Sequence, residues 1–157
     1  MIALRTARVE DASVISDILI ASISDLCTAD HGGNPQVIAD WTANKTAENI
    51  ALWIANPKTT LCLARLEDDD AGICAWRGDG EILLNYVSPN YQFRGVSTEM
   101  LAHMETELRE NGVQEGKLTS TQTAHQFYRQ AGWVDEGHPL EEMGIVGQPM
   151  TKNLVAL

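Results

Sequence analysis

Residues 81–100 read EILLNYVSPNYQFRGVSTEM, which combines an apolar run, a break and the start of a helical repeat. The run at 82–84 is apolar without alternation, as in a strand that is covered on both faces. A Ser-Pro-Asn segment at 88–90 ends that strand, and from Val96 the apolar positions recur with the period of an amphipathic helix. The Asn-Gly pair at 111–112 suits the C-terminal end of that helix. The stretch therefore predicts a central strand, a turn and a helix, in this order.

Strand and helix patterns alternate on both sides of this unit. Before it we expect a strand at 2–8, helices at about 10–22, 35–43 and 46–55, and a hairpin of strands 59–66 and 72–77 around an acidic turn. After it we expect a strand at 117–120, a helix at 124–131, and strands at 133–134 and 150–155. The order predicts an α/β (α+β) fold with a mixed, mostly antiparallel central sheet of about six to seven strands flanked by helices. No linker or repeat divides the 157 residues, so we expect a single domain, 1–157.

The composition is that of an acidic globular chain. Hydrophobic residues make up 44% and charged residues 21%, which argues against wholesale disorder. The formal net charge of -11 opposes binding to nucleic acid and to anionic membranes. The same field favours a cationic or amine-bearing substrate.

The sequence also bears on the compartment. The first residues show no basic segment that leads into a long apolar run, and no window approaches the roughly 18 apolar residues of a membrane span. The 3 cysteines are odd in number and lack a CxxC spacing, which predicts reduced thiols. We therefore expect a cytoplasmic protein.

The turn at 92–98, between the apolar strand and the helix, has the features of a phosphate-binding turn. Gly95 and Ser97 are small enough for a ligand to approach the backbone closely. The first N–H groups of the helix have no partners within the helix and lie at its positive end, and Arg94 adds charge beside them. The turn matches neither the Walker loop nor the dinucleotide fingerprint. A plain helix start with a glycine in its turn is the alternative interpretation.

This turn resembles a family signature. The pattern Gln92-x-x-Gly95-x-Ser97 is similar to the Gln/Arg-x-x-Gly-x-Gly/Ala signature of the GNAT acetyltransferases, with Ser97 where Gly or Ala is usual. The resemblance also covers the opening strand with Asp11-Ala12 and the strand end at 87–89.

A second segment, about 30 residues further on, resembles the Asn-x-x-Ala-x-x-x-Tyr-x-x-x-Gly-Phe element of the same family. Here Thr121 stands where Asn is common, and Trp133 stands where Phe is common. Ala124, Tyr128 and Gly132 match the pattern directly. The two segments have the expected order and spacing along nearly the whole chain.

The resemblance implies a GNAT-like fold and an acetyl-CoA-dependent N-acetyltransferase, with acetyl-CoA as co-substrate and no metal. Backbone amides of the turn would hold the pyrophosphate of the co-substrate, and the final helix would line its arm. The residues expected to contact acetyl-CoA are Val87, Gln92, Phe93, Arg94, Gly95, Val96, Ser97, Thr98, Thr121, Ala124, Phe127 and Tyr128.

Three positions are expected to serve the chemistry. Tyr128 falls at the position of the family's catalytic tyrosine and would protonate the leaving thiolate; alternatively it is a core residue of its helix. A backbone N–H near Val87 would stabilise the developing oxyanion. Glu81, at the start of the same strand, is a candidate base that would act through water, or else a solvated residue after a turn.

The acceptor site is expected from the segment after the first helix and from the central strand. The candidate acceptor-binding residues are Asp30, His31, Asn85 and Tyr86. Asp30 could contact an ammonium group, and His31 could act as a base, while a loop cap and a surface histidine are the alternatives. Cys27, Asp30 and His31 lie too close together, without a fourth ligand, to form a tetrahedral metal site.

The favoured function is acetyl transfer to a primary amine, with a small molecule as the partner. The alternatives are a noncatalytic acyl-CoA-binding or sensor module and a protein or peptide N-acetyltransferase. By analogy with the family, a homodimer could form if a late strand such as 149–155 offers an open edge.

Overall fold

The computed structural model describes residues 1–155. The helices are α1 (Ala12–Leu26), α2 (Thr28–His31), α3 (Pro35–Thr42), α4 (Ala47–Ala55), α5 (Val96–Glu110) and α6 (His125–Gln130), with short 3-10 turns η1 (Val9–Asp11) and η2 (Pro89–Tyr91). The strands are β1 (Ile2–Thr6), β2 (Thr59–Leu66), β3 (Asp69–Arg77), β4 (Ile82–Val87), β5 (Glu115–Ser120), β6 (Val134–Asp135), β7 (Leu140–Glu142) and β8 (Ile145–Asn153).

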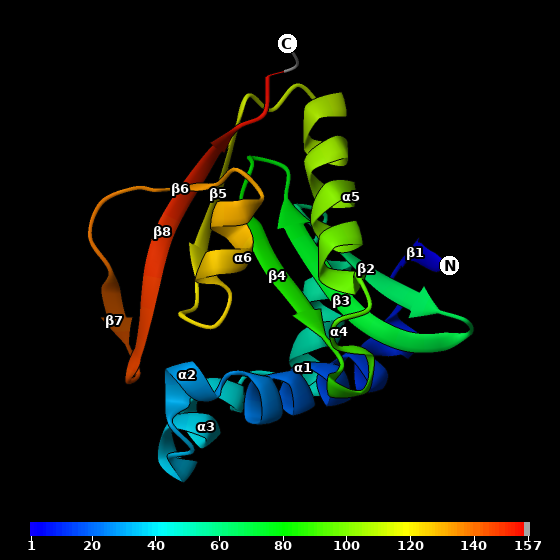
Figure 1. Cartoon of the computed structure of the whole chain (residues 1–157). Coiled ribbons are helices and arrows are strands. Elements are labelled where there is room, and N and C mark those ends of the chain that lie inside the picture. Colours follow the sequence, from blue (N-terminus) through cyan, green and yellow to red (C-terminus); the bar gives the residue numbers. More distant parts are fainter. Residues whose placement is uncertain (156–157) are drawn as a thin grey trace.

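The strands form two antiparallel half-sheets that meet at one end. The first has the order β1-β2-β3-β4, and the second has the order β5-β8-β6, with β7 paired to β8. An isolated parallel bridge between Glu81 and Lys117 joins them, where the Lys117 N–H donates to the Gly80 carbonyl at 2.9 Å. Beyond this bridge β4 and β5 separate (Figure 1). The predicted fold class is confirmed, although β7 brings the described strands to eight.

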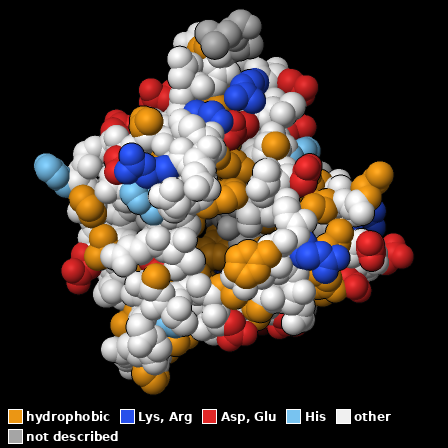
Figure 2. Space-filling model, viewed as in Figure 1, with side chains coloured by type: hydrophobic (Ala, Val, Ile, Leu, Met, Phe, Trp, Pro, Cys, Tyr) orange, Lys and Arg blue, Asp and Glu red, His pale blue; other side chains and the backbone are white. Residues whose placement is uncertain are grey.

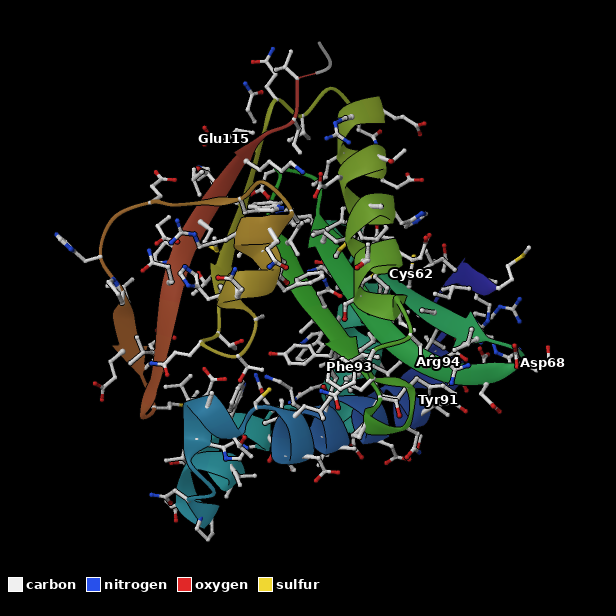
Figure 3. The ribbon with its side chains drawn as sticks, viewed as in Figure 1. Cys62, Asp68, Tyr91, Phe93, Arg94 and Glu115 are labelled. Carbon is white, nitrogen blue, oxygen red and sulfur yellow. The ribbon has the colours of Figure 1, made fainter. Side chains whose placement is uncertain are left out.

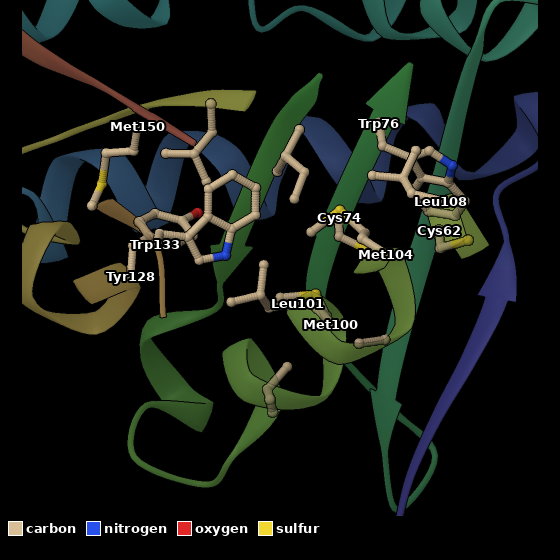
Figure 4. Packing of buried hydrophobic residues seen from close by; sticks show 14 of the residues in the cluster. Cys62, Cys74, Trp76, Met100, Leu101, Met104, Leu108, Tyr128, Trp133 and Met150 are labelled. Carbon is tan, nitrogen blue, oxygen red and sulfur yellow. The ribbon is translucent and has the colours of Figure 1, made fainter. Parts of the chain in front are cut away.

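Helices cover both faces of the first half-sheet (Figure 1). Leu61, Leu63 and Ile73 pack against α1 and α4, whereas Cys62 and Cys74 pack on the opposite face with α5. Figure 4 shows this second cluster, in which Tyr128 and Trp133 meet edge to face at 6.2 Å between ring centroids. The interior strands are therefore β2 and β3. Among the described residues, no helix is long and apolar enough to cross a bilayer.

The apolar run at 82–84 has a different cause from the one expected. Ala75 pairs with Leu84 and Trp76 with Ile82, so Leu83 is the extra residue of a β-bulge. The bulge shifts the period-two alternation by one position, and Leu83 remains 40% exposed. Helices α1 and α5 nevertheless contact β4 from opposite faces, so the prediction of a strand covered on both faces is confirmed. Only the cause of its unbroken apolar run differs, because the run comes from the bulge.

Element boundaries differ from the prediction in two places. In the acidic hairpin only Glu67 and Asp68 adopt positive φ values, of 52° and 77°, and Asp69 already begins β3. The predicted strand at 150–155 is part of the longer β8, which pairs with β5 on one side and with β6 and β7 on the other. The expected open edge at 149–155 was therefore wrong at Pro149–Thr151, where the chain's own strands cover both sides.

A buried carboxylate ties the second half-sheet to α5. Glu105 is 5% exposed and accepts hydrogen bonds from Lys152 at 2.7 Å, Trp133 at 3.2 Å and Arg109 at 3.3 Å. Lys152 also donates to the carbonyl of Ala131 at 2.7 Å. A buried charge needs partners of this kind, and here they come from α5 itself, from β8 and from the connection between α6 and β6. The spacing of these residues in the sequence gave no signal for this cluster.

Candidate active site

A cavity of about 390 Å³ lies where β4 and β5 separate. Its walls come from β4, from the turn before α5, from the connection between β5 and α6, and from the C-terminal end of α1. Since α1 and α5 lie on opposite faces of the sheet, the cavity is lined from both faces. Figure 2 shows a hollow near the middle of the molecule, bordered mostly by hydrophobic and neutral side chains.

The turn at 92–98 forms one wall. Gly95 precedes α5 with a φ of 83°, a left-handed conformation that favours glycine, and Phe93 also has a positive φ of 64°. No side chain caps the first turn of α5, so its leading N–H groups donate to no capping side chain. Figure 3 shows Phe93 on the cavity side of the turn and Arg94 on the opposite side. The turn therefore presents its backbone to the cavity.

The free edge of β4 forms the wall beside this turn. Because Ser88 N–H donates to the Ala71 carbonyl at 2.8 Å and the pairs of an antiparallel ladder alternate, the N–H groups of Asn85 and Val87 point away from β3. They therefore point toward the gap. The Asn85 side-chain N–H is 3.5 Å from the Ser97 carbonyl, while Asn85 Oδ1 is buried and has no hydrogen-bond partner within the described residues.

Tyr128 closes the cavity from α6. Its side chain is 7% exposed and packs edge to face on Phe127 and Trp133. Burial raises the pKa of Tyr128 to about 12, an effect that the neighbouring side-chain amide of Asn85 partly opposes. The phenol is therefore protonated at neutral pH and is available as a proton donor.

The start of α6 completes this side of the cavity. The Thr121 hydroxyl accepts a hydrogen bond from the Ala124 N–H at 3.2 Å, which holds the turn before the helix. All residues expected to contact acetyl-CoA line the cavity except Arg94. Two motifs that are distant in the sequence thus face the same space.

A family model covers most of the chain. Residues 19–154 match the family model described as "Acetyltransferase (GNAT) domain". The chain belongs to the GNAT acetyltransferase family. It is therefore an enzyme of the acyltransferase class, as the sequence motifs predicted.

Solved GNAT structures share the fold over nearly the whole chain. A GCN5-related N-acetyltransferase from Rhodopseudomonas palustris is 24% identical, with a TM-score of 0.86 and coverage of 96% of this chain and 94% of that one. PaiA N-acetyltransferase from Thermoplasma acidophilum, solved in complex with coenzyme A, is 17% identical, with a TM-score of 0.81 and coverage of 98% and 99%. A GNAT acetyltransferase from Streptococcus pneumoniae is 20% identical, with a TM-score of 0.68 and the same coverage. No curated protein matches this GNAT chain significantly.

Two of the four candidate acceptor-binding residues of this GNAT chain line the cavity, and two do not. Asn85 and Tyr86 extend from β4 toward opposite faces of the sheet, and burial raises the pKa of Tyr86. Asp30 instead accepts hydrogen bonds from the N–H groups of Gln122 at 2.7 Å and Thr123 at 3.3 Å, and from the Thr123 hydroxyl at 2.5 Å. Its carboxylate therefore caps the connection between β5 and α6.

His31 lies away from the cavity and is 4% exposed. Its Nε2 is 2.8 Å from the carbonyl of Ile23, and its Nδ1 accepts a hydrogen bond from the Gly33 N–H at 2.9 Å. These partners require the neutral ring with its proton on Nε2, so both nitrogens are already in use. This structural role replaces the expected role as a base.

Glu81 lies at the joined end of β4 and β5, beside Lys117, and does not line the cavity. Its N–H donates to the carboxylate of Asp79 at 3.2 Å, as expected of a residue after a tight turn. The described residues contain no group of three or more His, Cys, Asp or Glu that could hold a metal ion.

Sequence reasoning missed the wall that α1 provides. Ser22, Leu26 and Cys27 line the cavity from the face opposite α5, and burial raises the pKa of the Cys27 thiol to about 12. The sequence did contain a signal for this wall, because Ser22 is a polar residue within the apolar stripe of the first helix. Thr119 and Thr123 add two further hydroxyl groups to the cavity.

Proposed function

We propose that this GNAT enzyme transfers the acetyl group of acetyl-CoA to a primary amine of a small molecule, with Tyr128 as the general acid. The observation that carries the proposal is the meeting of three features around one cavity. These are the backbone of the turn at 92–98, the free edge of β4 and the buried phenol of Tyr128.

The cavity has the features that acetyl-CoA requires. The first turn of α5 offers N–H groups at the positive end of a helix, which suits a pyrophosphate. The buried Asn85 Oδ1 lacks a donor, and an amide N–H of the pantetheine arm would satisfy it. Val87, Thr121, Ala124 and Phe127 would line that arm.

The chain's own residues would assist the transfer at two atoms, the carbonyl oxygen and the sulfur of the thioester. Bound acetyl-CoA supplies a thioester carbonyl that an amine nitrogen can attack. The Val87 N–H would donate to the carbonyl oxygen as negative charge develops there. As the C–N bond forms and the C–S bond breaks, the Tyr128 hydroxyl would donate its proton to the sulfur. The attacking nitrogen loses a proton to water, and Tyr128 regains one from water.

The acceptor would enter from the side of α1. Ser22, Cys27 and Tyr86 lie on this side of the sheet, so the amine can approach the carbonyl from the face opposite the turn at 92–98. Asp30, His31 and Glu81 do not line the cavity, so the proposal assigns none of them the role of base.

Two measurements test the proposal. Calorimetry with CoA should show saturable binding to the purified protein. A thiol-release assay with acetyl-CoA should then show acceptor-dependent CoA formation with at least one small amine of a broad panel. Tight CoA binding without thiol release across the panel would favour the noncatalytic binding module, and release with peptides alone would favour a peptide N-acetyltransferase.

A further inference from the structure

The cavity has no formally charged side chain in its walls. Within residues 1–155, no Asp, Glu, Lys, Arg or His lines it, although the chain carries 22 acidic and 11 basic side chains. The titratable groups that do line it are Cys27, Tyr86, Tyr91 and Tyr128, and all four have raised pKa values. Each is therefore uncharged at neutral pH.

The charged groups nearest to these walls are already engaged or face elsewhere. Both carboxylate oxygens of Asp30 accept hydrogen bonds from the connection between β5 and α6. Arg94 lies on the far side of its turn, and Glu81 lies beside Lys117 at the joined end of the strands. No carboxylate therefore lines the cavity to pair directly with an ammonium group, although the charge of Asp30 acts from behind the wall on Cys27 and Tyr86.

An alkylammonium ion would enter such a cavity at a high cost. Removing it from water without a counter-charge is strongly unfavourable, and the surroundings instead favour the neutral form of the amine. The net charge of the whole chain, -11, draws cations toward the surface, but this field is screened over about 10 Å at an ionic strength of 0.1 M. The field can therefore steer a cation without holding it in the cavity.

A neutral amine removes the need for a base before attack. A neutral amine and a thioester give an amide and a thiol, so the proton lost by nitrogen balances the proton gained by sulfur. At pH 7 an alkylamine with a pKa of about 10.4 is less than about 0.1% neutral, whereas an α-amine with a pKa of about 7.8 is more than about 10% neutral. Only the second kind reaches this cavity in its reactive form without help.

The walls also indicate what the amine should carry. Leu26, Leu83 and Leu84 offer apolar contacts, and Ser22, Thr119 and Thr123 offer neutral hydrogen-bonding groups. Building on the proposed acetyl transfer, we propose that the acceptor is a small α-amino amide or ester with an apolar side chain, which reacts as the neutral amine, and that polyamines and other alkylammonium ions are excluded.

A matched pair of amines tests this inference. Leucinamide and 3-methylbutylamine share their branched alkyl group, but the carboxamide of leucinamide lowers the pKa of its amine; 1,4-diaminobutane represents the polyamines. At pH 7 the thiol-release kcat/KM should be at least about tenfold higher for leucinamide than for either alkylamine. Toward pH 9 the rate with 3-methylbutylamine should rise about tenfold per pH unit, while the rate with leucinamide reaches a plateau near pH 8. Calorimetry with the CoA-saturated protein at pH 7 should detect leucinamide and not diaminobutane.

A carboxylate placed in the wall should change this preference. In Ser22→Asp the ratio of leucinamide to diaminobutane turnover should fall at least about tenfold, because the new charge pairs with an ammonium group. Ser24→Asp, on the same helix but outside the cavity, is the matched control and should keep the wild-type ratio. If Ser22→Asp does not fold by circular dichroism, Leu83→Glu, at a half-exposed cavity position, takes its place.

The outcomes separate the two proposals. Preference for an alkylamine or diamine at pH 7 overturns the inference and leaves the acetyl transfer intact. CoA binding without thiol release from any amine overturns the acetyl transfer and, with it, the inference.

Discussion

The two ends of the gap between β4 and β5 differ in how they treat polar groups. At the joined end, a backbone β-bridge links Glu81 to Lys117, and the buried carboxylate of Glu105 accepts hydrogen bonds from Lys152 and Trp133. At the open end, the N–H groups of Asn85 and Val87 point into the gap, and Asn85 Oδ1 has no hydrogen-bond partner among residues 1–155. The comparison shows that the buried charge of this fold is paired at the joined end, where the two half-sheets are held together. The fold leaves neutral polar groups unpaired where a ligand can satisfy them.

The largest expected effect is at the open end. Tyr128→Phe should lower kcat for thiol release by about 10²- to 10⁴-fold, because the leaving thiolate loses its proton donor. CoA affinity measured by calorimetry should change little. Tyr91→Phe, which removes a tyrosine hydroxyl at another position of the cavity wall to which no contact with the acceptor is assigned, is the matched control and should keep most of kcat. Equal kcat values in Tyr128→Phe and wild type would remove the general-acid role.

At the joined end, we expect a substitution to lower the stability of the folded protein instead of its turnover. Glu105→Gln leaves the Lys152 ammonium without its counter-charge and should lower the free energy of unfolding by about 3 kcal/mol in urea titrations. Glu110→Gln, at an exposed position near the end of the same helix, should change it by less than about 0.5 kcal/mol. If Glu105→Gln and Glu110→Gln have the same free energy of unfolding, the buried cluster around Glu105 does not stabilise the packing of α5 against β8.

A smaller effect is expected where the turn meets the co-substrate. Gly95→Asp should weaken CoA binding about tenfold or more in calorimetry, because it adds a negative charge beside a diphosphate. Gly95→Ala is the control for backbone strain, because any side chain at a φ of 83° costs about 1–2 kcal/mol, whereas only the Asp variant also adds a charge. Equal CoA affinities for the Asp and Ala variants would show that charge at this position is irrelevant and that the diphosphate lies elsewhere.

The smallest effect concerns an ion pair outside both ends. The hydrogen bonds from Arg5, at 2.8 Å, lower the pKa of Asp11 from 3.8 to about 2. A lowered folded-state pKa stabilises the protein above the unfolded value, and this contribution is lost as the pH falls from about 4 to about 2. With solvent screening, Asp11→Asn should lose about 1 kcal/mol at pH 6 and roughly a third of that at pH 2.5, where the folded-state carboxyl is still partly ionised. A loss that is the same at both pH values would contradict this origin, and CoA binding at pH 7 should not change.

Much of the open end could be predicted because its signals are local. Gly95 indicates a left-handed turn because glycine favours a positive φ. The apolar residues that recur with a helical period from Val96 predict which face of the helix is buried. The position of Tyr128 relative to Gly132 resembles the family pattern, and the structure brings this residue to the cavity. These features depend on neighbours within a few residues in the chain.

The sequence by itself thus determined most of the order of strands and helices, though not α2 or β7, together with the glycine turn before α5 and the family. Only the tertiary structure decided that Asp30 and His31 are used by the fold itself, since their partners are set by packing and not by spacing. It also decided that Glu105 meets Lys152, which lies 47 residues later, and that no charge lines the cavity. These contacts form where segments that are distant in the chain pack together. The period of the apolar residues indicates which face of a helix or strand is buried, but it does not indicate which residues pack against that face.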